Sequence, residues 1–402
     1  MDDNIFSSRH YKINQISMRV LGIWPEQSSI ARIFLPSCFL LLNVSLYIPQ
    51  LRQLSNFWGD IDRMMEVITS CGVMTASTIM MVNSIMKNEE ILGLVNRIRR
   101  DWQKSTNPEL LTILNLYANS GRRRTIIHTL MMYGGGVVFF SLPLSPMVLN
   151  AIVPLNESRP KKYLYSVDYG VNNEEHYYSI LLHSWVVTFS CMSIFVGIDS
   201  IFAVWVQHCC ALFEISGFYL KNKLRNVDTH RGDGEKSQIC EETVRTNLRS
   251  CINQHQVALR FADQIESVYS IVQAAEMGIS VMLMSVSGLL LVVKLNNIDD
   301  AVRYSTVVVC VLYRLHHQTV SGQDMINHSS RISEYAYGCD WHKFPLKTQK
   351  LMMLIMIRAQ RPCALTAGKI YVINMENFSE IVKTSVSYFT VLSSVRETSP
   401  PS

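Results

Sequence analysis

The stretch ILLHSWVVTFSCMSIFVGIDSIFAVWV, residues 180–206, decides the fold class of this chain. It is mostly apolar, contains one acidic residue, Asp199, and has no Lys or Arg. A helix rises about 1.5 Å per residue, so roughly 20 apolar residues cross the ~30 Å hydrocarbon core of a bilayer. Inside lipid each backbone polar group needs a partner within its own segment, which a helix provides. The stretch therefore predicts a membrane-spanning helix.

The whole chain has the composition of a membrane protein with many spans. Of its 402 residues, 48% are hydrophobic and 17% are charged, whereas about 25% are charged in a typical soluble domain. The apolar residues gather in blocks, and a long inner stretch at 207–267 also has a helical pattern. We therefore predict an all-α fold in which residues 1–402 form one seven-helix transmembrane unit, with helices that extend below the membrane. The predicted spans are 33–51, 64–86, 125–149, 180–206, 268–293, 301–320 and a weaker one at 378–395.

The distribution of positive charge predicts the orientation. Loops rich in Lys and Arg tend to stay in the cytoplasm. With the amino terminus inside and seven spans, most of the 37 Lys and Arg residues fall on the inner side. The carboxyl terminus is then extracellular, and so is the sequon Asn156-Glu157-Ser158, between spans three and four. Asn156 is therefore the predicted glycosylation site.

Several other classes fit the sequence less well. A G-protein-coupled receptor has its amino terminus outside and usually an outer-loop disulfide, whereas none of the ten cysteines lies in a predicted outer loop. A secondary transporter usually shows paired repeats with broken helices, and no internal repeat is evident. His208-Cys209-Cys210 lacks a second ligand pair at zinc spacing, so it indicates a helix end with buried thiols. We expect no metal, no cofactor and no enzymatic activity.

Two acidic residues and a glycine run lie within predicted spans. Charges inside a membrane are costly and often functional. Asp199 and Glu276 each pair with a basic neighbour or backbone group, or else they serve ion or proton passage. The run Gly134-Gly135-Gly136 in span three allows either close helix packing or a ligand cavity.

The carboxyl-terminal quarter carries the most specific pattern. Together with Leu21-Gly22-Ile23-Trp24-Pro25 near the start, its residue types and their order resemble those of the insect odorant receptor family. One departure is Val386, where many relatives have an aromatic residue. The residues of this quarter that carry the resemblance are Glu334, Tyr335, Tyr337, Trp341, Lys350-Leu351, Arg358-Ala359-Gln360-Arg361-Pro362, Leu365-Thr366-Ala367-Gly368-Lys369, Phe378 and Ser387-Tyr388-Phe389-Thr390-Val391-Leu392.

The resemblance implies a ligand-gated, nonselective cation channel in the plasma membrane of a sensory neuron dendrite. Its expected partners are a small volatile ligand, the lipid bilayer and a co-receptor subunit in a tetramer, with no nucleic acid. A gustatory receptor of the same superfamily and a secondary transporter remain the alternatives. By resemblance the ligand binds among helices two, three, four and six, and the last helix lines one central pore.

The last predicted helix has a hydroxyl stripe. At about 100° per residue, Lys383, Ser387, Thr390 and Ser394 fall on one side, and an apolar face of Ile381, Tyr388, Leu392 and Val395 is expected on another. A hydroxyl-lined wall with a hydrophobic constriction suits a weakly selective pore, although a Ser/Thr-rich packing face is the alternative. Lys383 is expected at the inner boundary, where its ammonium group reaches water. The predicted pore-lining residues are Ser387, Thr390, Val391, Ser394 and Val395, of which Val391, Ser394 and Val395 match the gate by resemblance.

The predicted ligand pocket is a set of outer-half side chains on the four helices that the resemblance indicates. Aromatic and Met side chains suit a flexible apolar ligand that is bound largely by burial. The set comprises Met65, Ile68, Thr69, Gly72, Tyr133, Gly136, Phe140, Trp185, Phe189, Met192, Tyr304 and Val307.

Overall fold

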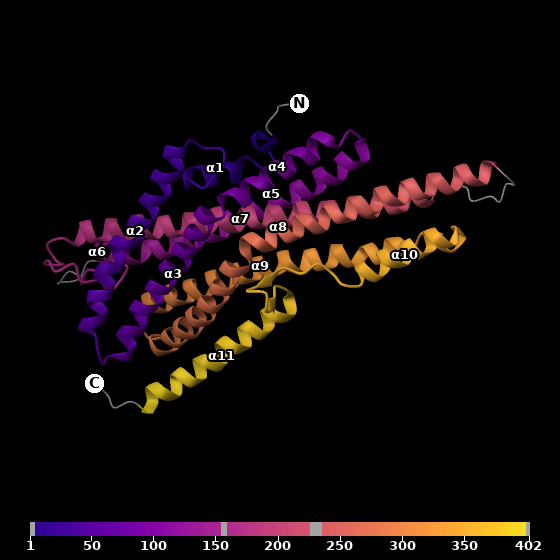
Figure 1. The fold of residues 1–402 in the computed structure, drawn as a ribbon. Helices are drawn as coiled ribbons and strands as arrows, with labels where there is room; N and C mark the ends of the chain where they lie inside the picture. The colour runs from indigo at the N-terminus through magenta and orange to yellow at the C-terminus, as the bar shows by residue number, and fades with distance from the viewer. Residues whose placement is uncertain (1–4, 154–158, 226–234, 399–402) are drawn as a thin grey trace.

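The computed structural model describes residues 5–153, 159–225 and 235–398, and it is built almost entirely of helices (Figure 1). The predicted all-α fold is confirmed, with one minimal hairpin added. Asn156 lies outside the described residues. The long helices are α2 (Ser29–Asn56), α3 (Ile61–Met86), α5 (Pro108–Ser141), α7 (Tyr177–Arg225), α8 (Glu235–Val293), α9 (Ile298–Tyr337) and α11 (Met375–Thr398). The shorter elements are η1 (Ile5–Ser7), α1 (Lys12–Val20), α4 (Asn88–Lys104), η2 (Leu142–Leu144), α6 (Ser145–Ile152), η3 (Trp341–Lys343), α10 (Leu346–Ala359), β1 (Thr366–Ala367) and β2 (Tyr371–Val372).

Among the described residues, five helical stretches are long and apolar enough to cross a membrane. They contain the first five predicted spans. The sixth and seventh predicted spans lie in α9 and α11, which have 40 and 24 residues. Both helices exceed the roughly 20 residues that a crossing needs, but their sequences are more polar. The five apolar stretches are Ser29–Asn56, Ile61–Met86, Pro108–Ile152, Tyr177–Asn222 and Glu242–Val293.

The third predicted span is interrupted in the structure. The prediction was one helix over 125–149, but α5 ends at Ser141 and a 3-10 turn separates it from α6. Pro143 and Pro146 explain the break, because proline lacks a backbone N–H and disfavours helical geometry at the preceding residue. The interruption places η2 beside the segment 159–176 that follows α6: the Tyr177 hydroxyl donates to the Pro143 carbonyl at 3.3 Å and to the Lys162 carbonyl at 3.0 Å.

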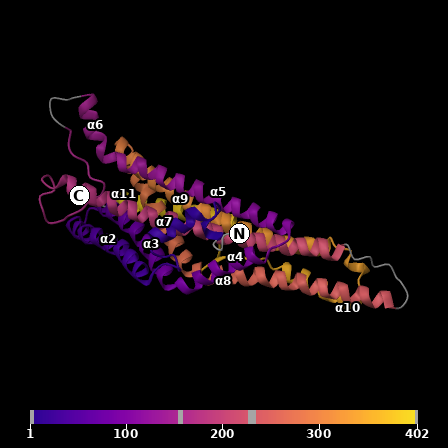
Figure 2. The ribbon, with the colours of Figure 1, turned by 90° about the horizontal axis from the view of Figure 1, so that it is seen from above.

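The bundle is much longer than a bilayer is thick. Helices α7 and α8 have 49 and 59 residues, at least twice what a crossing needs. Figure 2 shows α6 at one end of the molecule and α10 at the opposite end, with α7 and α8 running between them. Helices of this length extend beyond a hydrocarbon layer, and the inner side as the side on which they do so stays a prediction.

Helix α7 forms the centre of the core. Its middle turns are buried on all sides by α5, α8 and α9, which accounts for the continuous apolar run at residues 180–206. Helix α1 is fastened to this centre by Asn14, whose amide donates to Thr125 Oγ1 at 3.0 Å and to Ser200 Oγ at 3.1 Å. The amino-terminal segment is therefore part of the same packed unit.

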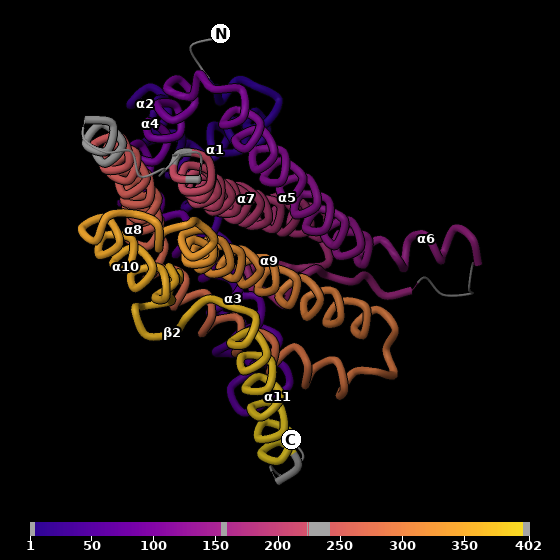
Figure 3. Tube along the Cα trace, turned by 90° about the vertical axis from the view of Figure 1, so that its right-hand side faces the viewer, coloured from indigo at the N-terminus to yellow at the C-terminus, as the bar shows by residue number. Residues whose placement is uncertain are grey.

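Helix α11 lies at the edge of the bundle (Figures 1 and 3). It packs mainly on α8, where Ser285 Oγ donates to the Ser385 carbonyl at 2.9 Å. At its far end Arg396 binds both carboxylate oxygens of Asp62 on α3, at 2.8 and 3.0 Å. One side of α11 is thus held to the bundle, and the other side is left uncovered.

The β1–β2 hairpin sets the entry to α11. It turns through Gly368 and Lys369, both at positive φ, and docks on α8 through the Gly368 N–H, which donates to the Ser270 carbonyl at 2.8 Å. Ile373, just after the hairpin, lies against α9 at Gly322. A Cβ at Gly322 would lie 2.1 Å from the Ile373 carbonyl oxygen, so the chain passes α9 closely enough to require glycine.

Gly322→Ala therefore tests how the hairpin is seated. The methyl group displaces the Ile373 backbone, and overpacking of this kind costs about 1–3 kcal/mol. We expect a lower melting temperature of the detergent-solubilised protein, measured by size-exclusion chromatography after heating. Gly93→Ala in α4 is the matched control, because nothing lies within 4 Å of a Cβ there and alanine favours a helix. Equal melting temperatures for the two variants would contradict this account.

Candidate functional site

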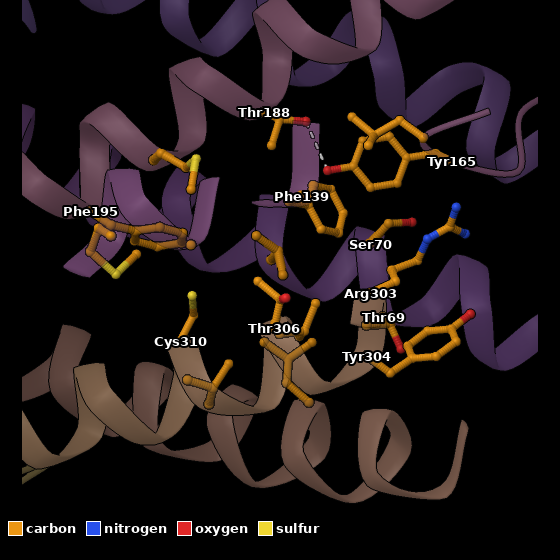
Figure 4. Close-up of a pocket in the computed structure, with 18 of the residues that line it drawn as sticks. Thr69, Ser70, Phe139, Tyr165, Thr188, Phe195, Arg303, Tyr304, Thr306 and Cys310 are labelled. Atoms are coloured by element: carbon orange, nitrogen blue, oxygen red, sulfur yellow. Dashed lines mark hydrogen bonds between the residues drawn. The ribbon is translucent and has the colours of Figure 1, made fainter. Parts of the chain in front are cut away.

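A partly enclosed cavity lies between α3, α5, α7, α8 and α9 (Figure 4). Its volume is about 130 Å³, close to the ~150 Å³ of an engineered protein cavity that binds benzene. The wall is mostly apolar, with hydroxyl groups distributed around it and one arginine toward each end. It is lined by Glu66, Thr69, Ser70, Val73, Met132, Gly135, Phe139, Leu164, Tyr165, Ser166, Thr188, Met192, Phe195, Leu283, Arg303, Tyr304, Thr306, Val307, Cys310, Val311 and Arg314.

The segment between α6 and α7 lines the cavity at one end. Leu164 is buried, and the Tyr165 hydroxyl lies 2.9 Å from Thr188 Oγ1 of α7. Two contacts with α9 hold the segment in place: Lys162 forms an ion pair with Asp299, and Arg303 Nη2 donates to the Tyr163 carbonyl at 3.1 Å. This segment is therefore a fixed wall of the cavity.

The other end of the cavity rests on a buried ionic cluster. Arg314 of α9 donates from Nε to Asp199 of α7 and from Nη2 to Glu276 of α8, both at 2.8 Å. Its guanidinium carbon also lies 3.8 Å from the centre of the Phe195 ring. The two carboxylate side chains are only 2% and 3% exposed, so water does not solvate them and Arg314 is the cation that both of them contact.

Further polar side chains complete the cluster. Gln318 Nε2 donates to the second oxygen of Asp199 at 3.2 Å, and the His128 ring, fully buried, stacks on His317 with 4.5 Å between ring centres. The cluster connects α5, α7, α8 and α9. The sequence left open whether Asp199 and Glu276 pair with a base or pass ions; the structure pairs both with one arginine.

Four of the twelve predicted pocket residues line the cavity: Thr69, Met192, Tyr304 and Val307. The other eight lie outside it. Phe140, Trp185 and Phe189 line a separate groove between α5 and α7. Their role in ligand binding stays a prediction.

The remaining five make helix-to-helix contacts or are half-buried. Tyr133 stacks on Phe189 with 5.6 Å between ring centres, and Gly136 leaves room for the Met192 side chain. On α3, Met65 packs in a cluster with α8 residues, and Gly72 permits close approach of Met282 and Leu283. Ile68 is half-buried.

The predicted and the observed lining residues differ because the helices are rotated about their axes relative to the prediction. On α5 the cavity is lined by Met132, Gly135 and Phe139, each one residue before a predicted one, and one residue turns a helix by about 100°. A span that is apolar all round offers no signal that fixes its rotation. The predicted pocket did not include Tyr165, Arg303 or Arg314, which all line the cavity. Arg303 and Arg314 could have been found from the sequence, because a charged residue in or beside a predicted span is often functional.

The predicted pore-lining residues share the uncovered side of α11. Ser387, Thr390, Val391, Ser394 and Val395 are all exposed in the isolated chain. Ser385, on the side that packs against α8, is 3% exposed, and Ser387 lies about 200° around the helix from it. The hydroxyl stripe is therefore opposite the packed side.

The predicted apolar face of α11 is only partly covered in the single chain. Ile381 is buried and Leu392 packs against the bundle, but Tyr388 and Val395 are 57% and 51% exposed. These two lie on the flank of the hydroxyl stripe, because the packed side is centred on Ser385. Lys383 is exposed and paired with Glu380 at 2.8 Å.

The sequence and the fold both match one group of known proteins. The 7tm Odorant receptor family profile matches residues 60–386. Odorant receptor 13a of Drosophila melanogaster is 23% identical over 209 residues, which are 49% of this chain and 48% of that protein. Odorant receptor Or2 of Anopheles gambiae is 23% identical over 51% of this chain and 53% of its own length. The chain thus spans about half the length of these curated relatives.

Solved structures extend the likeness to the whole fold. The insect olfactory receptor OR5 from Machilis hrabei, in complex with eugenol, superposes with a TM-score of 0.80 at 14% identity, covering 96% of this chain and 97% of that one. Another structure of OR5 gives a TM-score of 0.73 at 16% identity, with 97% and 99% covered.

The ionic cluster gives a stability prediction. Arg314→Met leaves two carboxylates buried without a cation, and removing one partner of a buried pair costs about 3–5 kcal/mol. We expect a large drop in melting temperature and in correctly folded protein, measured by fluorescence-detected chromatography.

Adding Asp199→Asn and Glu276→Gln to Arg314→Met removes all three charges and is expected to restore part of the stability. Lys383→Met, at an exposed pair, is the control and is expected to melt like the natural protein. If Arg314→Met melted like Lys383→Met, the cluster would not have the role described.

Proposed function

The chain belongs to the 7tm odorant receptor family, and from that we propose that it is an odorant-binding subunit of a ligand-gated, nonselective cation channel. It is a receptor, not an enzyme. The observation that carries the proposal is the mostly apolar cavity inside the helix bundle. A buried space of this kind, lined by helices from distant parts of the chain, suits a small molecule whose binding changes helix packing.

The proposed ligand is a small volatile organic molecule. A cavity of about 130 Å³ admits a molecule near the size of a substituted ring or a short chain, bound mainly by burial at ~25 cal/mol per Å². The OR5 structure with eugenol supports a small organic ligand in this fold. Within the predicted set, Thr69, Met192, Tyr304 and Val307 are the residues for which the cavity supports contact.

The proposed pore is formed by the uncovered side of α11. In an assembly of four subunits with a co-receptor, hydroxyls at Ser387, Thr390 and Ser394 would face water in a shared lumen, with Val391 and Val395 available for a hydrophobic constriction. Exposure of these side chains in the single chain supports this arrangement. It also gives a reason for a membrane-spanning helix with this polarity.

A short path of packed residues supports coupling between cavity and pore. Leu283 of α8 lines the cavity, and its neighbour Met284 belongs with it to one cluster that includes Val382 of α11. Ser385 Oγ lies 4.0 Å from Met284 Sδ. A ligand that displaces Leu283 therefore acts on the helix that supports α11.

The proposed location is the plasma membrane of a sensory neuron dendrite, with the amino terminus in the cytoplasm and the carboxyl terminus outside. The apolar helices and the family membership support a membrane protein. The charge distribution supports this orientation. Residues 1–402 would then be one channel subunit.

Filling the cavity tests ligand binding. Val307→Trp adds an indole ring to the cavity, so we expect the odorant concentration for half-maximal current to rise roughly tenfold or more. Currents would be recorded in cells that co-express a co-receptor, with a broad odorant panel. Val309→Trp is the matched control on the same helix, because Val309 is 54% exposed and does not line this cavity. Odorant uptake without current would instead support a transporter.

Cysteine substitution tests the pore. Cysteines at Ser387, Thr390, Val391 and Ser394 are expected to react with a positively charged thiol reagent and reduce current, because their side chains face the lumen. Ser385→Cys is the control, since Ser385 is buried against α8 and should stay unreactive. Unchanged currents at all four exposed positions would overturn the pore assignment.

A further inference from the structure

Two hollows lie on either side of the contact between α5 and α9. One is the cavity described above, and the other is a groove of about 320 Å³ on the outside of the bundle. Gly135 of α5 and Thr306 and Cys310 of α9 line both of them. Figure 4 shows the Thr306 and Cys310 side chains on the cavity side of α9, and all three residues keep part of their surface exposed. A single layer of residues therefore separates the groove from the cavity.

This wall is thin because α5 has no side chain in it. A Cβ at Gly135 would lie 2.8 Å from Cys310 Sγ and 3.8 Å from Thr306 Cγ2. The Thr306 hydroxyl donates to the Val302 carbonyl of its own helix at 2.7 Å, so it does not tie α9 to α5. The Cys310 sulfur is thus the side-chain atom that comes nearest to Gly135. A change of the Cys310 rotamer moves this atom away and thins the wall further.

Polar contacts fasten α5 to α9 on both sides of this place. Toward one end Arg124 forms an ion pair with Asp324, and toward the other Ser145, just beyond α5, donates to Asp299 at 3.4 Å. In the part of the chain that the structure describes, residues 129–141 form no hydrogen bond or ion pair with α9, and α5 packs more extensively on α7 than on α9. The two helices can therefore move apart at Gly135 without losing a polar contact.

The groove has the surface of a site that faces lipid. Its rim is apolar and exposed, with Leu130, Met131 and Val138 on α5 and Val309 on α9. These residues lie in the third and sixth predicted spans, so the groove is at membrane depth whichever end of the bundle is outside. Transfer of apolar surface from water to hydrocarbon is favourable. A lipophilic molecule is therefore concentrated in the bilayer beside the groove.

We propose that a lateral passage between α5 and α9, at Gly134-Gly135 and closed by Cys310, admits lipophilic odorants to the cavity from the bilayer. This inference rests on the proposed function. The odorant leaves the lipid at the groove, passes Gly135 when the Cys310 side chain turns aside, and enters the cavity without crossing water. The segment 159–176 can stay in place, held by its contacts with α7 and α9. Solubility in lipid then sets how fast an odorant acts, whereas the cavity sets how tightly it binds.

Gly134→Phe tests the passage. Gly134 lines the groove but not the cavity, and nothing lies within 4 Å of a Cβ there, so the ring obstructs the lipid side and leaves the cavity wall unchanged. Obstructing a route slows entry and exit by the same factor, which leaves the dissociation constant as it was. We expect current onset at low odorant concentration and decay after washing both to slow about fivefold, with the half-maximal concentration unchanged within about twofold.

The recordings use rapid solution exchange on cells that co-express a co-receptor. The probes are neutral odorants of about seven or eight heavy atoms, such as benzaldehyde, anisole and 2-heptanone, which suit a cavity of this size. Release of a tritiated probe from the purified receptor in lipid nanodiscs measures exit without the gating step. It is expected to slow in Gly134→Phe by the same factor as the decay of the current.

Val137→Phe is the matched control. It adds the same ring to α5 in the groove toward α7, and that groove shares no lining residue with the cavity among the described residues. Its onset and decay are expected to equal those of the natural receptor. Cys310→Ala removes the sulfur nearest to Gly135 and is expected to change the rates in the opposite direction, with faster onset and faster decay.

The other outcomes overturn the passage. Rates that stay unchanged in Gly134→Phe mean that odorants arrive by another route. A changed half-maximal concentration with unchanged onset means that the groove belongs to the binding site, and equal slowing in Val137→Phe means that bulk on α5 acts on gating. In each of these cases odorants still evoke current, so the proposed function stands. If no probe evokes current in the natural receptor, the proposed function fails and the passage fails with it.

Discussion

The buried guanidinium of Arg314 is the constraint on which the rest of the bundle depends. It lies between carboxylates of α7 and α8 at 2.8 Å on each side, at a depth where an unpaired charge costs several kcal/mol. The three helices therefore cannot slide or rotate independently without separating opposite charges in a medium that does not screen them. Packing of α5 against the same place, through the stacked His128 and His317 rings, fixes the fourth helix.

The cavity exists because of where this cluster lies. Apolar side chains fill the core along α7. The Arg314 guanidinium is held by its two carboxylate partners, so it cannot move to fill the cavity beside it. Arg314 lines one end of the cavity, and the segment 159–176 lines the other and is held by contacts to α7 and α9. Between these two polar ends lies a space whose wall is mostly apolar. Ligand binding in the cavity would act on helices that the Arg314 cluster already holds together at one end.

Helix α11 is constrained differently. It is held along one side by Ser285 and at one end by the Asp62–Arg396 pair, and the rest of its surface has hydroxyls at the centre and apolar side chains at the flanks. In a single chain this surface is uncovered. A helix of this kind is stable in a membrane only when other subunits and water meet its polar stripe, which is why the proposed pore requires an assembly.

The sequence by itself determined the fold class, the approximate position of each long helix and the family. Long apolar blocks have one physical solution in lipid, and the residue pattern after Glu334 is specific. The sequence also located the acidic residues whose burial needed an explanation. The tertiary structure alone decided which sides of the helices face one another. Asp199, Glu276 and Arg314 lie far apart along the chain, so their pairing follows from packing. The same reason explains why four of twelve predicted pocket residues reach the cavity: an evenly apolar helix gives no signal of its rotation, and an error of one residue turns a side chain by about 100°.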